Sequence, residues 1–110
     1  MNITQSVTIA LLCSAFSATS FAGSALSEIK ISDDILYFST RDNQSVNASC
    51  ILPANSGIWA VSMNSATGKN AYLALMTAAS TGQKVTVTSA NDCSDADGYE
   101  RPASVAIDGS

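Results

Sequence analysis

The chain has 110 residues, a formal net charge of −4 and no histidine. Its five basic residues are scattered singly, which argues against nucleic acids and anionic membranes as partners, because these require clustered Lys and Arg. Without histidine, the thiolates of Cys50 and Cys93 would make a poor metal site, and a catalytic cysteine would lack its usual imidazole base. We therefore expect no metal and no cofactor.

The first 22 residues have the pattern of an export signal. The apolar run 9–13 is followed by small residues up to Ala22, giving a short apolar core ahead of a small-x-small cleavage pattern. This run is too short to span a bilayer. The alternative is a buried N-terminal helix. We predict a signal peptide over 1–22, cleavage after Ala22, and a secreted or periplasmic protein with one domain over 23–110.

Two cysteines remain once Cys13 has been removed with the signal. Cys50 and Cys93 form an even pair in an oxidising compartment, which predicts a disulfide.

Three strands are predicted before any helix. Alternation with period two covers 28–32 and β-prone residues continue over 35–40, so that the acidic pair at 33–34 is interpreted as a bulge or tight turn inside one long, bent strand. The second strand is predicted at 46–52 and the third at 58–62.

A helix is predicted over 67–80, with Ser/Thr cap candidates before it and Gly82 after it. Its inward face is expected to hold Ala71, Tyr72, Ala74, Leu75, Met76, Ala78 and Ala79, whereas Leu73 falls outside this face. Two more strands follow at 84–88 and 103–107, joined by the acidic loop 91–101.

This order predicts a mainly β domain with one helix, a five-stranded Greek-key barrel of the OB-fold type in which the helix lies between strands 3 and 4. A helix packed on a meander sheet is the alternative. The barrel is favoured because closure hides the sheet edges of a small domain. The disulfide would then join the second strand to the end of the fourth.

The segments SGIWAVSM at 56–63 and YLALMTAASTGQKVTV at 72–87, with a cysteine shortly after, carry a resemblance. They resemble the binding subunits of subtilase-cytotoxin and pertussis-like A-B toxins. The resemblance implies a glycan-binding protein that forms a closed homo-oligomer, expected to be a pentamer, and that acts beside a catalytic partner. The second disulfide of those subunits has no counterpart here, and no sugar-binding residue is carried over.

Aromatic and acidic residues are the candidates for ligand binding. Trp59 and Tyr37 could stack on a sugar, and Tyr99 is the better candidate because the loop between the last two strands is a usual binding edge of OB folds. The competing interpretation of Trp59 is a core residue. Asp95 and Asp97 would supply polar contacts from the acidic loop, whose spacing does not match a calcium-binding EF-hand.

These observations favour a non-catalytic binding module, with an oligomeric glycan binder as the specific form. A monomeric interaction or inhibitor protein is the first alternative. The second is a small hydrolase that would use a carboxylate pair, either at 33–34 or at 95 and 97, as acid and base. Neighbouring residues on a strand point to opposite faces, and the pair at 95 and 97 falls in a loop that is expected to be mobile, so we expect the protein not to be an enzyme.

Overall fold

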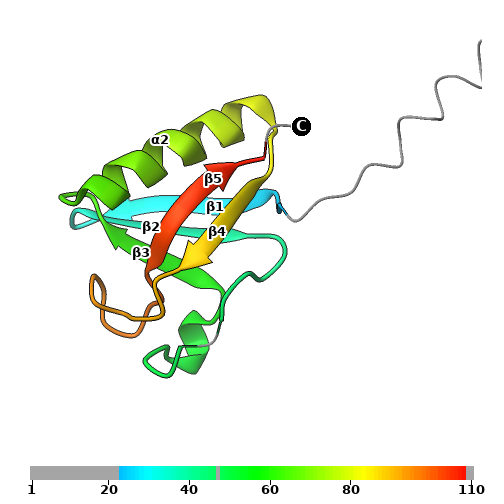
Figure 1. Ribbon diagram of the computed structural model, residues 1–110. Helices are drawn as coiled ribbons and strands as arrows, with labels where there is room; N and C mark the ends of the chain where they lie inside the picture. Colours follow the sequence, from blue (N-terminus) through cyan, green and yellow to red (C-terminus); the bar gives the residue numbers. More distant parts are fainter. Residues whose placement is uncertain (1–22, 47, 109–110) are drawn as a thin grey trace, which may run out of the picture.

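The computed structural model describes residues 23–46 and 48–108, and the predicted signal segment lies outside them. The element order is β1 (Leu26–Ser32), β2 (Ile35–Thr40), the short 3-10 helix η2 (Pro53–Asn55), β3 (Ile58–Ser62), α2 (Ala66–Thr81), β4 (Val85–Ser89) and β5 (Pro102–Ile107). The strands form two antiparallel sheets, one of order β1-β2-β3 and one of order β4-β5 (Figure 1). The described part of the chain is therefore mainly β with one α-helix, as predicted.

The segment expected to be one bent strand is a β-hairpin. β1 pairs antiparallel with β2 up to Ser32 and Ile35, so Asp33 and Asp34 alone make the turn. Both have positive φ, 51° and 62°. Positive φ at both central positions gives the type I′ turn, whose twist matches that of the flanking strands, and Asp tolerates this conformation. The acidic pair does mark a tight turn, but it reverses the chain instead of bending one strand.

The strand predicted at 46–52 is not formed. Its described residues lie in turns and irregular structure, and Val46 and Leu52 are 55% and 57% exposed. The disulfide Cys50–Cys93 is present, with a Cα–Cα distance of 6.0 Å. It therefore joins the loop before β3 to the loop after β4, and does not join two strands.

The helix α2 has the caps that the sequence predicts. The Ser65 hydroxyl accepts a hydrogen bond from the Gly68 amide at 2.9 Å, and Gly82 ends the helix in the left-handed conformation. The buried stripe is narrower than expected and consists of Gly68, Ala71, Leu75 and Ala78. Met76 and Ala79, predicted to face inward, are exposed. Each directly follows a buried residue, and consecutive helical residues point about 100° apart around the axis.

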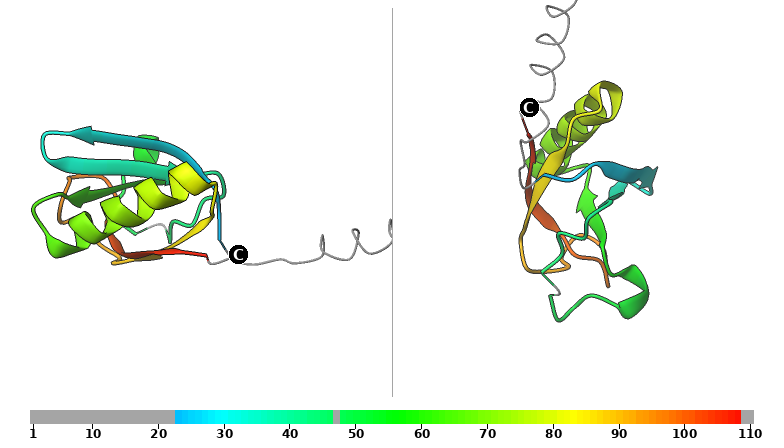
Figure 2. Two further views of the ribbon diagram at one scale, coloured as in Figure 1. Left: turned by 90° about the horizontal axis from the view of Figure 1, so that it is seen from above. Right: turned by 90° about the vertical axis from the view of Figure 1, so that its right-hand side faces the viewer.

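The core lies between the two sheets and the helix. From above, α2 runs along the edge where the β1-β2-β3 sheet faces the β4-β5 sheet (Figure 2). The inward side chains include Leu36, Phe38 and Trp59 from the larger sheet, Leu75 from the helix and Val85 from the smaller sheet. Alternate residues of β2 are buried, as expected for a strand with one face on the core.

Two isolated bridges connect the sheets. Ser24 pairs antiparallel with Val85, and Trp59 pairs parallel with Glu100. At the first bridge the Ser24 and Val85 amides each donate to the other's carbonyl at 2.9 Å. At the second, the Ala60 amide donates to the Glu100 carbonyl at 2.9 Å. The chain just before β1 therefore meets β4, and β3 meets the chain just before β5, although the ladders do not continue.

Candidate binding site

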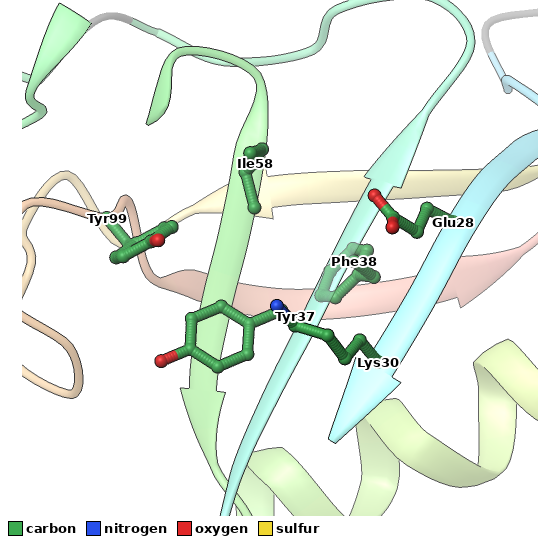
Figure 3. A pocket seen from close by; sticks show the side chains of 6 residues that line it. All are labelled: Glu28, Lys30, Tyr37, Phe38, Ile58 and Tyr99. Atoms are coloured by element: carbon green, nitrogen blue, oxygen red, sulfur yellow. The ribbon is translucent and has the colours of Figure 1, made fainter. Parts of the chain in front are cut away.

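A small pocket lies on the outer face of the three-stranded sheet, where the β4–β5 loop meets it (Figure 3). The residues that line it are Glu28, Lys30, Tyr37, Phe38, Ile58 and Tyr99. The strand register explains this arrangement, because Lys30 lies opposite Tyr37 and Ser39 lies between Glu28 and Ile58. Glu28, Lys30, Tyr37 and Ile58 alternate with the inward-facing positions and so share the outer face. Phe38 belongs to the core and forms part of the pocket wall from the inner side.

The pocket contains an aromatic pair with a cation beside it. The rings of Tyr37 and Tyr99 meet edge to face, with centroids 5.0 Å apart and planes at 69°. The Lys30 ammonium lies 5.2 Å from the centroid of the Tyr37 ring, within the range of a cation–π interaction. Glu28 on the same strand face supplies a carboxylate. Apolar ring surface, phenol hydroxyls and both signs of charge are thus presented within one small area.

The residue after Tyr99 is a buried carboxylate that holds the loop in place. Glu100 is 1% exposed. Its side chain accepts hydrogen bonds from the hydroxyls of Ser45 and Ser89 and from the Val46 amide. Buried charges require such donors. The network joins the segment after β2, the end of β4 and the start of β5, and so fixes the backbone next to Tyr99.

Two further contacts anchor the β4–β5 loop to the segment before β3. Leu52 and Asn55 donate to the Gly98 carbonyl at 3.0 and 3.1 Å through the amide and the side chain, respectively. The disulfide joins the same two segments, and Figure 1 shows them side by side below the sheets. Tyr99 is consequently presented from a loop with multiple attachments.

A surface ion pair joins the two ends of the β4–β5 loop. Arg101 donates from Nε and Nη2 to the two carboxylate oxygens of Asp92, both at 2.8 Å. The hydrogen bonds from Arg101 and from Ser94 hold the pKa of Asp92 well below its usual value, and the Asp92 carboxylate raises the pKa of Arg101.

The four predicted site residues fall in different environments. Tyr99 lines the pocket. Trp59 is 1% exposed and stacks on Phe38 in the core, with ring centroids 6.3 Å apart. Asp95 accepts a hydrogen bond from the Ser62 amide at 2.8 Å and so fastens the loop to the end of β3, whereas Asp97 is exposed. Neither carboxylate lines the pocket.

The sequence analysis did not predict Glu28, Lys30, Phe38 or Ile58 as residues of this pocket. The signal that could have found them is the alternation of β1 and β2 combined with a hairpin register, which places residues 28, 30 and 37 on one face. Treating 28–40 as a single strand removed that pairing.

No group of three or more Asp, Glu, Cys or His side chains within 23–46 and 48–108 is arranged to hold a metal ion. No helix in this part of the chain is long and apolar enough to cross a membrane. Comparisons with protein-family models, with curated proteins and with solved structures found no match. The resemblance to toxin binding subunits therefore stays a prediction.

Proposed function

We propose that this protein is a secreted or periplasmic, non-catalytic binding module that takes a glycan at the Tyr37–Tyr99 pocket. The single observation that carries the proposal is the aromatic pair at 5.0 Å with Lys30 and Glu28 beside it on an otherwise regular sheet face. An aromatic surface next to charged and hydroxyl groups suits a sugar ring, which has apolar C–H faces and polar edges.

The strand arrangement supports an OB-type barrel as the fold. The two isolated bridges extend the strand order around a circle. β3 is next to the segment leading into β5, β5 pairs with β4, and β4 is next to the chain just before β1. OB folds bind oligonucleotides and oligosaccharides on the face of their second and third strands and with the loop between the last two strands. Tyr37, Ile58 and Tyr99 come from those elements.

Charge selects between the two ligand classes. The net charge of −4 opposes a polyphosphate backbone, whose binding depends on several Lys or Arg contacts. Only Lys30 lines the pocket as a cation. An oligosaccharide is therefore the favoured ligand. The hollow has a volume of about 50 Å³, so that it would receive one edge or substituent of a sugar.

The carboxylates near the pocket support a binding role instead of hydrolysis. Glycosidases use two carboxyl groups flanking the bond that is cleaved. Glu28 is the one carboxylate that lines this pocket in the described part of the chain. Asp33 and Asp34 are at the far end of the hairpin, in its turn.

A shallow site of this kind binds more tightly when several copies of it are joined in one assembly. A closed homo-oligomer would present several copies to one glycan-bearing surface and raise the avidity without new contacts. This part of the proposal comes from the resemblance and is tested separately by light scattering on the purified protein. A closed ring would support the toxin-subunit type, and a monomer would leave a glycan-binding module without that assembly.

The test of the site is a glycan array with four forms of the protein. We expect the wild type to bind a defined set of glycans, and Tyr99→Ala to lower affinity at least tenfold, which corresponds to about 1.4 kcal/mol. Lys30→Ala should weaken binding of the same set, while Lys69→Ala on the exposed side of α2 should leave it unchanged. An empty array, or equal binding by all four forms, would contradict the proposal and favour a protein-interaction role.

A further inference from the structure

The last described residue of the chain carries a buried carboxylate oxygen that the fold leaves without a partner. Asp108 follows β5, and its backbone amide donates to the Lys84 carbonyl at 2.8 Å. Its Oδ1 accepts a hydrogen bond from the Thr86 hydroxyl at 3.0 Å. Its Oδ2 is buried and has no hydrogen-bond partner within the described residues. A buried carboxylate oxygen without a donor is costly.

Gly23 lies close to this oxygen. A Cβ added to Gly23 would lie 1.8 Å from Asp108 Oδ2 and 2.6 Å from its Cγ. With a Cβ–N separation of roughly 2.5 Å in standard geometry, the Gly23 nitrogen lies at most about 4.3 Å from Oδ2. A side chain at position 23 would have to displace the carboxylate from its present place. Gly23 is also buried.

Gly23 is the residue that export processing would make the first of the mature chain, if the signal is cleaved after Ala22 as its small-x-small pattern predicts. Cleavage would convert the Gly23 nitrogen from an amide with one fixed proton into an ammonium group with three. We propose that the Gly23 ammonium released by this cleavage forms a buried ion pair with Asp108 and fastens the N-terminus to the end of β5. The pair rests on the proposed export and is independent of the glycan site.

The surroundings suit such a pair. Ser24, the next residue, is held by the bridge to Val85 at the start of β4. Figures 1 and 2 show the start of β1, the start of β4 and the end of β5 together at one end of the molecule. Three charged residues lie next to this end: Lys84 through its Cβ, and Arg41 and Asp42 through backbone amides that donate to Ala25 and Ser24. Their charges would set the background against which the pair titrates.

The ion pair predicts the direction in which the pKa of the Gly23 amino group shifts. A carboxylate within about 4 to 6 Å favours the charged form of an amine, so the α-amino pKa should rise above its ordinary value of about 8. The ion pair then contributes stability below about pH 8 and loses it as the pH rises through the folded pKa.

The experiment uses protein purified from the periplasm with ¹³C-labelled glycine. Mass spectrometry should give a chain that begins at Gly23. The pH titration of the Gly23 Cα resonance should give a pKa about one unit higher in wild type than in Asp108→Asn, whereas the matched variant Asp97→Asn, in the exposed loop, should behave as wild type. Equal pKa values in all three forms would overturn the ion pair. A different first residue would overturn both the pair and the predicted cleavage site, while leaving the glycan site untouched.

Discussion

Replacement of Glu100 tests whether the loop that carries Tyr99 is held by a buried charge. Glu100→Ala removes the acceptor of three hydrogen bonds, from two serine hydroxyls and the Val46 amide. A hydrogen bond to a charged group contributes about 1.5 to 3 kcal/mol. The loss of the three bonds is partly offset because the alanine variant does not have to bury a carboxylate, which is itself unfavourable. We expect a net loss of about 3 kcal/mol in the free energy of unfolding.

Urea denaturation followed by the fluorescence of Trp59, which is buried in the core, measures this loss. Glu100→Gln should cost less, about 1 to 2 kcal/mol, since a neutral acceptor remains and neutral hydrogen bonds contribute about 0.5 to 1.5 kcal/mol each. Glu28→Ala is the control because Glu28 is exposed, and it should change stability by less than about 0.5 kcal/mol. If Glu100→Ala cost no more than Glu28→Ala, the network would not be what holds the loop.

Three further predictions concern the rest of the fold. Leu75→Ala should cost about 2 to 5 kcal/mol because Leu75 is fully buried, whereas Leu73→Ala, at a position 65% exposed on the same helix, should cost less than about 0.5 kcal/mol. Similar losses in urea denaturation would contradict this assignment of the buried helix face. The disulfide spans 43 positions, so reduction should lower the stability in urea by about 4 kcal/mol, and thiols that alkylate freely without reductant would show that it does not form. The hydrogen bond from Arg101 is the main cause of the lowered pKa of Asp92. The ion pair should therefore add at most about 1 kcal/mol to the free energy of unfolding at this exposed position, present above about pH 4 and lost on further acidification. An Asp92→Asn variant with the acid stability of the wild type at every pH would contradict this.

Elements with strong local signals could be predicted from the sequence. The strand at 58–62 has the predicted bounds, and the helix extends one residue beyond the prediction at each end. Both follow from short-range physics, because alternation, a serine N-cap and a glycine C-cap act within a few residues. The disulfide was predicted from the cysteine count and from the predicted oxidising compartment, and it is present.

The hairpin and the segment before β3 depended on longer-range effects. Asp-Asp lacks the glycine that usually marks a type I′ turn, so the reversal at Asp33 and Asp34 was interpreted as a bend. The alternating pattern of 46–52 suggested a strand, but the Val46 amide donates to Glu100 and the Leu52 amide to Gly98. These tertiary contacts take the hydrogen bonds that a sheet ladder would need.

The site was predictable only in part for the same reason. Tyr99 could be chosen because of the loop it occupies, and it lines the pocket. Trp59 could not be separated from a core residue without knowing which face of β3 turns inward, and it is buried. Lys30 becomes a site candidate only when the β1–β2 register places it opposite Tyr37.

The most direct test of the central claim is an amide NMR titration of the oxidised protein with a panel of neutral and acidic mono- and disaccharides at millimolar concentration. Binding at the proposed pocket predicts that at least one sugar shifts the amides of Glu28, Lys30, Tyr37 and Tyr99 in a saturable way, leaves the exposed face of α2 unchanged around Leu73, and has no effect on a Tyr99→Ala variant at the same concentration. A panel that shifts nothing, or shifts that gather on another face and persist in Tyr99→Ala, would contradict the assignment of this pocket as a glycan site.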